Sequence, residues 1–230
     1  MNGRRLAAFA ASVGALLFLI SHSTAMAESG PSFDCKAART GPEKAICASP
    51  SLSALDRRVA AAYRKAMAAF DAPTQAALRT DQRYFLEARN AYFGTRDYEL
   101  KSDLADRAQM LESLDLSPRP GWDGKWVSVV GLIEIAPKGR GRQASISTVA
   151  LTMSHPVCDL EAGALPDGDA LVVGGSPAEL KENDGWTVRL TRTGAALNAE
   201  LLPPKGGPDG EPPFCGHIPS IAGAFFPVRP

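Results

Sequence analysis

The stretch FDCKAARTGPEKAICASPSLSALDRRVAAAYRKAM, residues 33–67, places two cysteines around one short helical turn and continues directly into a long amphipathic segment. Pro42 stands at the start of that turn, where its missing N–H costs nothing, and Thr40 or Gly41 can cap it. From Leu52 onward, apolar residues recur at steps of three and four, which is the pattern of one helix face. The stretch therefore predicts a short helix followed by a long one.

The same helical period continues to about residue 114. A break at 71–73 and an interruption at Gly94 divide it into three segments with short connections. Short connections favour antiparallel neighbours, so residues 31–116 are predicted to form a small helical bundle. A bundle of this size has a thin core and benefits from a covalent staple.

After a Pro- and Gly-rich linker at 117–121, the pattern changes. Runs rich in β-branched residues, each bounded by Gly or Pro, indicate strands at 126–135, 144–152, 170–173, 186–191 and 222–228. Roughly seven short strands over residues 122–230 are typical of a small antiparallel sandwich or barrel. The predicted fold class is therefore α+β, a disulfide-stapled helical bundle followed by a β-sandwich or barrel.

The first 27 residues resemble a signal peptide. Arg4 and Arg5 precede an apolar run at 6–20, and Ala25-Met26-Ala27 supplies the small residues of a cleavage site. The run is shorter than the span of about 20 residues that crosses a bilayer. We expect cleavage before Glu28 and a periplasmic or secreted protein without an integral membrane segment.

Four cysteines, Cys35, Cys47, Cys158 and Cys215, lie after the predicted signal peptide. An even count in an oxidising compartment indicates disulfides. Of the three possible pairings, Cys35 with Cys47 and Cys158 with Cys215 keeps each bridge within one half of the chain. The alternative of a reactive dithiol at Cys35 and Cys47 requires a spacing of about two residues, which the sequence does not have.

Charge excludes some partners. Basic and acidic residues number 25 each, and removal of Arg4 and Arg5 leaves a net charge of −2. A basic stripe for nucleic acid and a polybasic patch for anionic lipid are both missing from the sequence. We expect neither class of partner.

One group of residues has the composition of a metal site. His155 and Cys158, together with Cys215 and His217, have the residue types of a two-Cys, two-His zinc centre. Zinc requires thiolates, which rarely persist in an oxidising compartment, so the disulfide is the favoured interpretation. No metal and no cofactor are predicted.

Other chemical candidates also have simpler interpretations. Residues 174–177 (GGSP) indicate a turn, residues 138–142 (KGRGR) an exposed hairpin tip rather than an anion site, and Asp167 and Asp169 solvated loop carboxylates. The tryptophans are expected in the core, with a ligand pocket as the alternative; they are Trp122, Trp126 and Trp186. No nucleophile with its base is found in the sequence, so an enzyme is not predicted.

The helical half resembles the bacterial lysozyme inhibitor LprI-like N-terminal domain family, whose members are exported. The resemblance covers about residues 31–114 and rests on Phe33-Asp34-Cys35, Pro42-Glu43-Lys44, Ile46-Cys47, Pro50-Ser51-Leu52, Leu55-Asp56, Tyr63, Gln82-Arg83-Tyr84-Phe85-Leu86, Arg89-Asn90 and Arg107. The chain departs from the family pattern where a second cysteine pair is replaced by Tyr92 and Tyr98, a tryptophan by Phe85 and a tyrosine by Leu104.

The resemblance implies a binding protein that occludes the active-site cleft of a lysozyme. The alternative is an envelope interaction module or small-ligand-binding module without action on lysozyme. A basic lysozyme would be attracted by an acidic cluster such as Asp97, Glu99, Asp103 and Asp106. Ordinary helix-surface pairing, Asp97 with Lys101 and Asp103 with Arg107, explains the same cluster and is favoured. The partner-binding residues are not predicted.

Overall fold

The computed structural model describes residues 30–117, 120–152, 155–207, 210–217 and 221–230. The predicted signal peptide and two residues of the predicted linker lie outside this part of the chain. Helices and strands occur in the order η1 (Cys35–Ala37), α1 (Gly41–Ala48), α2 (Pro50–Ala69), α3 (Ala72–Tyr92), α4 (Leu100–Ser113), β1 (Gly124–Ser128), β2 (Gly131–Lys138), β3 (Gly141–Val149), β4 (Val157–Asp167), β5 (Ala170–Val173), α5 (Pro177–Glu182), β6 (Thr187–Thr193), β7 (Ala196–Leu202) and β8 (Gly223–Pro227).

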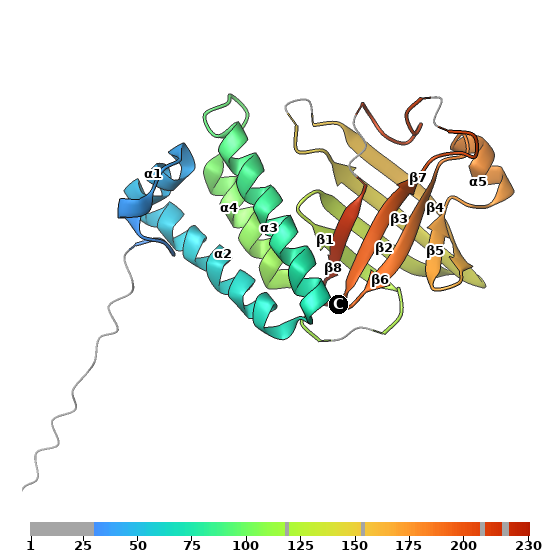
Figure 1. Cartoon of the computed structure of the whole chain (residues 1–230), viewed down its shortest axis with the longest axis horizontal. Coiled ribbons are helices and arrows are strands. Elements are labelled where there is room, and N and C mark those ends of the chain that lie inside the picture. The colour runs from blue at the N-terminus through green and yellow to red at the C-terminus, as the bar shows by residue number, and fades with distance from the viewer. Residues whose placement is uncertain (1–29, 118–119, 153–154, 208–209, 218–220) are drawn as a thin grey trace, which may run out of the picture.

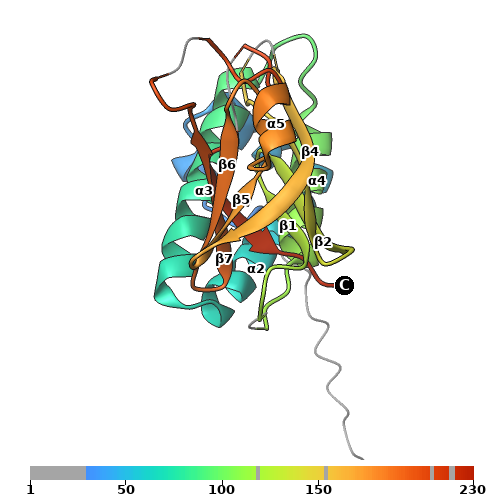
Figure 2. The same ribbon diagram turned by 90° about the vertical axis from the view of Figure 1, so that its right-hand side faces the viewer.

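The fold class is confirmed, and the β-rich half is a closed barrel of eight antiparallel strands in sequence order. Helices α2, α3 and α4 lie on one outer side of this barrel (Figure 1), and the view turned by 90° shows the barrel in front of them (Figure 2). The molecule is thus a layer of helices against a barrel wall.

Each helix start has a local reason in the sequence. Thr40 and Glu43 form a capping box at α1, in which the Thr40 hydroxyl accepts from the Glu43 N–H and the Glu43 carboxylate accepts from the Thr40 N–H. Ser49 caps α2 and Asp71 caps α3, each followed by a proline in the first turn. Polar caps and prolines at the starts explain why the helical segments end and restart where the sequence predicts.

The barrel interior is filled with side chains. Inward positions alternate along each strand, and the core they form is Trp126, Ile133, Ile135, Ala144, Ile146, Leu160, Ala162, Ala164, Leu171, Val173, Val188, Leu190, Leu197, Ala199, Ile221 and Phe225. Trp126 is fully buried, and its indole N–H donates to the Trp122 carbonyl oxygen at 2.9 Å. The core interpretation of Trp126 therefore holds over the pocket alternative.

A second hydrophobic core lies between the helices and the barrel wall. Phe226 points outward from the strand that sends Phe225 inward, and its ring stacks on Phe70 with centroids 6.4 Å apart. Leu78, Leu104, Leu111 and Leu114 are buried in the same cluster, together with Ala196 of the barrel. The helices therefore complete their core with the outer face of the barrel.

Backbone hydrogen bonds also join the two halves. The Asp115 N–H donates to the Pro227 carbonyl at 2.7 Å, and the Arg229 N–H donates to the Ser113 carbonyl at 3.0 Å. The division into a helical unit at 31–116 and a β-unit at 122–230 remains a prediction about how the chain folds, because the two share a continuous interface.

The secondary structure of the β-half departs from the prediction in three places. The run at 126–135 is two strands, β1 and β2, and the turn between them ends at Gly131, whose φ is 150°. A Cβ at that position would lie 2.2 Å from the Ser147 carbonyl oxygen, so the backbones approach too closely for a side chain. Strands β4 and β7 were not predicted, which raises the count to eight.

The third departure is at 174–177, where the predicted turn leads directly into helix α5. Ser176 and Glu179 form a capping box, with Pro177 in the first turn. The sequence Ser-Pro-Ala-Glu at 176–179 has the spacing of a capping box and therefore indicates a helix start. The prediction was wrong because the glycines before it, which do form a bend, masked the helix start.

Candidate functional site

The loop between α3 and α4, residues 93–99, projects from the upper end of the helices in Figure 1. Helix α3 ends at Tyr92 with Phe93 as its C-cap, and Gly94 follows with φ 88°, a left-handed conformation that favours glycine. Phe93, Arg96 and Asp97 are exposed, with 38% of Phe93 accessible to solvent. An exposed aromatic ring and a guanidinium thus stand on one short loop.

Two contacts hold this loop in place. The Phe93 ring lies against Gly41 of α1, where a Cβ would come within 2.7 Å of Phe93 Cδ1. The Tyr98 hydroxyl donates to Asp103 Oδ2 at 2.6 Å across the start of α4. Burial raises the pKa of both groups, and the hydrogen bond opposes that rise for Asp103. The loop is therefore fixed to α1 and α4 at its two ends.

Helix α1 is held in turn by the disulfide between Cys35 and Cys47, whose Cα atoms are 5.8 Å apart. The bridge closes a loop of 12 residues and ties η1 to the end of α1. Since α1 contacts Phe93, the staple supports the position of the α3–α4 loop as well as the N-terminal arm.

A buried polar network connects α3, α4 and the barrel. Arg107 Nη1 lies 2.7 Å from Asp81 Oδ2, and Arg107 Nε and Nη2 both donate to Gln82 Oε1, at 3.0 and 2.7 Å. Asp81 Oδ1 accepts from the Val129 N–H of the barrel at 2.9 Å. The guanidinium also lies over the Phe85 ring, 5.2 Å from its centroid. The motif residues Gln82, Phe85 and Arg107 therefore join α3 to α4, and Asp81 links this network to the barrel.

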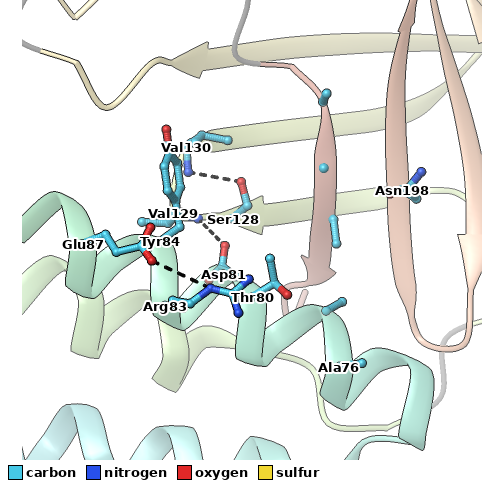
Figure 3. Close-up of a pocket in the computed structure, with 14 residues that line it drawn as sticks. Ala76, Thr80, Asp81, Arg83, Tyr84, Glu87, Ser128, Val129, Val130 and Asn198 are labelled. Atoms are coloured by element: carbon cyan, nitrogen blue, oxygen red, sulfur yellow. Dashed lines mark hydrogen bonds and ion pairs between the residues drawn. The ribbon is translucent and has the colours of Figure 1, made fainter.

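Beside this network lies a groove of about 560 Å³ between α3 and the barrel, shown in Figure 3. Tyr84, 39% exposed, stands next to Val130 at one side of the groove, and Arg83 and Glu87 pair loosely at its mouth, 3.9 Å apart. The floor consists of small residues from α3 and β8. The N–H groups of Val129 and Val130 are already bonded to Asp81 and Ser128, so the strand edge here is not open to another strand.

A second cleft, of about 330 Å³, lies on the other side of α3 between α1, α2 and α4. It is lined by many of the residues on which the family resemblance rests, including Phe33, Glu43, Asp56, Tyr63, Phe85 and Arg89. Arg89 is only 6% exposed. Charged groups of both signs therefore share this cleft with aromatic walls.

The cysteines of the β-half form a disulfide between Cys158 and Cys215, with Cα atoms 4.0 Å apart. His155 lies edge-on to Tyr92, with ring centroids 5.9 Å apart, and His217 Nδ1 is 3.7 Å from Glu211 Oε1. Both sulfurs are consumed in the bridge, so they supply no thiolate to a metal. Among the described residues, no group of three or more His, Cys, Asp or Glu side chains has a metal-binding arrangement.

The remaining predicted features fall on the surface or in the core. Residues 138–142 form the tip of the hairpin between β2 and β3 and are largely exposed. Asp167 pairs with Arg189, which lies on β6, at 2.5 Å, and Trp186 is 9% exposed. None of the grooves described above is lined by a tryptophan.

The predicted pairing of Asp103 with Arg107 is wrong. Arg107 points into the interface and pairs with Asp81, while Asp103 accepts from Tyr98. Helical spacing makes the first pair possible but does not decide it, because burial gives Arg107 a closer partner on another helix. Asp97, Glu99 and Asp106 remain exposed.

The helical half is the part of the chain that resembles a known protein family. Residues 35–116 match the family model of lysozyme inhibitor LprI. The match begins at Cys35 and ends just after α4, so it covers the stapled helices and stops before the barrel. Neither the curated proteins nor the solved structures contain a match to the chain.

The LprI match covers the helical region alone. Proteins of this family are inhibitors rather than enzymes, and their partner is a protein, lysozyme. The two disulfides suit an oxidising compartment. Within the described residues, no helix is both long and apolar enough to cross a membrane.

Sequence reasoning missed Asp81, which holds Arg107 and the barrel edge together. The helical spacing could have indicated that Asp81 is buried, since it lies three residues after Leu78 and four before Phe85, on the apolar face of α3. A charged residue at a core-facing position needs a partner, and Arg107 supplies it.

Proposed function

We propose that this protein is an exported lysozyme inhibitor whose α3–α4 loop enters the active-site cleft of the enzyme. The observation that carries this is the exposed pair of Phe93 and Arg96 on a loop anchored to a stapled α1, inside the region that matches LprI. A fixed loop loses less conformational entropy on binding than a free one.

The chemistry of the loop suits the target. Glycosidases such as lysozyme place two carboxyl groups on either side of the scissile bond. A guanidinium at Arg96 is the complementary group for such a site, and an aromatic ring beside it is a frequent source of binding energy at interfaces. The exposed carboxylates of Asp97, Glu99 and Asp106 surround the loop on the side of α4 and would attract a basic enzyme.

The test is a lysozyme lysis assay with the chain lacking residues 1–27, in which the barrel is retained because the helices share its core. We compare the intact protein with the double variant Phe93→Ala/Arg96→Ala. The matched control is Tyr84→Ala/Arg83→Ala, which removes the same kinds of side chain from the groove in Figure 3.

Inhibition by the intact protein that falls at least tenfold in the loop variant and persists in the control supports the proposal. Absence of inhibition at micromolar protein, with animal and bacterial lysozymes alike, would exclude it. Loss in the control but not in the loop variant would assign the inhibition to the groove beside α3 and would contradict the role of the loop. Absence of inhibition would favour the second candidate, an envelope module without action on lysozyme that binds through this groove, whose 560 Å³ and exposed Tyr84 are the observation in its favour.

A further inference from the structure

The 330 Å³ cleft between α1, α2, α3 and α4 holds a buried cation without a counter-ion in contact. Arg89 is 94% buried. Within the described residues its guanidinium makes one hydrogen bond, from Nη2 to Asn90 Oδ1 at 3.2 Å, and forms no ion pair, while Nε has no acceptor. A guanidinium removed from water is costly unless an anion and further acceptors replace its hydration.

The same cleft holds two carboxylates that do not pair with Arg89. Asp56, 8% exposed, uses Oδ2 to accept from the Ser32 N–H at 2.6 Å, and no described residue donates to its Oδ1. Glu43 uses Oε2 to accept from the N–H groups of Arg39 and Thr40, at 2.7 and 2.9 Å. Among the described residues neither carboxylate forms an ion pair with Arg89, although the N–H groups of Thr40 and Arg39 and, more weakly, the charge of Arg89 lower the pKa of Glu43.

Opposite charges are therefore held apart across one small cleft with aromatic walls. A simple anion would meet Arg89 but also the negative charges of Asp56 and Glu43. A simple cation would meet the carboxylates but also Arg89. A ligand that carries both charges, one at each end, satisfies all three groups.

We propose that this cleft binds a free α-amino acid with an apolar side chain. The ligand carboxylate pairs with the Arg89 guanidinium, and its ammonium group lies against Asp56 and Glu43. Its side chain packs against Phe33, Tyr63 and Phe85, which line the same cleft. A volume of about 330 Å³ is at the lower end of small-molecule sites and suits a ligand of this size.

This inference does not depend on the action on lysozyme, and its test needs no lysozyme. Isothermal titration calorimetry on the chain lacking residues 1–27 measures binding of L-leucine and L-phenylalanine. Two analogues of leucine separate the charges: 4-methylpentanoate lacks the ammonium group, and 3-methylbutylamine lacks the carboxylate.

We expect saturable binding of at least one amino acid and at least tenfold weaker binding of both analogues. Arg89→Gln and Asp56→Asn should each weaken amino-acid binding at least tenfold, whereas Arg83→Gln, an exposed arginine on the same helix, should leave it unchanged. Circular dichroism verifies that each variant is folded.

No heat with either amino acid at millimolar concentration would overturn the proposal. Equal binding of the amino acid and either analogue would overturn it as well, and this comparison uses only the intact protein. It therefore remains decisive if Arg89→Gln or Asp56→Asn fails to fold.

Discussion

The two halves of the molecule build their cores in different ways. The barrel closes on itself and fills its interior with its own side chains, among them Trp126 and Phe225. The helices are held by a disulfide at one end and by the barrel at the other, and they take Phe226 and Ala196 from the barrel into their own core. The difference shows that a small helical region can be stable when it uses the outside of a neighbouring sheet as its missing layer.

The matched region also divides its residues between two tasks. Arg107 is committed to its contacts with Asp81 and Gln82, whereas Asp56, Tyr63 and Arg89 line an open cleft. Gln82 and Phe85 take part in both, since they contact Arg107 and also line the cleft. A motif residue in this protein is therefore not by itself a partner-binding residue.

The largest effect is expected from Asp81→Ala. The substitution leaves Arg107 buried without its anion and removes the acceptor of the Val129 N–H, so stability should fall by about 3–5 kcal/mol. Chemical denaturation measures the loss. Glu87→Ala, which removes an exposed partner of Arg83 on the same helix, should change stability by less than about 0.5 kcal/mol. Equal effects of the two changes would contradict the docking role of Asp81.

Phe225 and Phe226 are neighbours on β8 but belong to different hydrophobic cores, so substitutions at these two positions test the cores separately. Phe225→Ala removes a ring from the barrel interior, and Phe226→Ala removes one from the helix side, each at a cost of about 3–5 kcal/mol. We expect Phe226→Ala to lower the melting temperature of the helical circular dichroism signal more than that of the tryptophan fluorescence, since Trp126 lies in the barrel. A coincident shift in both signals for both variants would show a single cooperative unit instead.

The helical period of the sequence predicted the helices well because the caps of α1, α2 and α3 stand close to prolines at the helix starts; these caps are Thr40, Ser49 and Asp71. The sequence predicted the barrel less completely. Strand β4 contains Gly163 and Pro166, and β7 carries two alanines, so neither has the β-branched composition that marks a strand. Their pairing partners, rather than their own residues, give them strand structure.

The cleft and the interface were harder to foresee. Arg89, Asp56 and Glu43 lie on three different helices, and only the packing of those helices brings them into one cleft. For the same reason Arg107 pairs with Asp81 rather than with Asp103, its neighbour on α4. Local spacing identifies which pairs are possible, and burial decides which of them form.

Removal of either disulfide should have the next smaller effect on stability. In the chain-entropy model, removing the bridge of 57-residue separation costs about 4 kcal/mol and removing that of 12-residue separation about 3 kcal/mol. Cys35→Ser/Cys47→Ser should increase hydrogen exchange in α1 and the α3–α4 loop and leave the barrel strands unchanged. Cys158→Ser/Cys215→Ser should do the reverse. Faster exchange throughout the molecule in either case would argue against two separately held regions.

The smallest effect concerns the start of α1. The N–H groups of Thr40 and Arg39 lower the pKa of Glu43 below its usual value of 4.5. Because the folded-state pKa is lowered, this carboxylate stabilises the fold above its unfolded-state pKa, and that contribution is lost as pH falls through the folded-state value. Glu43→Gln, compared with the intact protein, should cost about 1 kcal/mol at neutral pH and less in acid. Equal differences at both pH values would contradict a charged cap.

In the proposed function, the helical half presents the α3–α4 loop to a lysozyme while the barrel packs against the helices. Hydrogen–deuterium exchange with and without saturating lysozyme tests this most directly. We expect protection at residues 93–99 and at the adjoining start of α1, with the barrel strands unchanged. Protection confined to the barrel, or the absence of protection in a complex that forms, would contradict it.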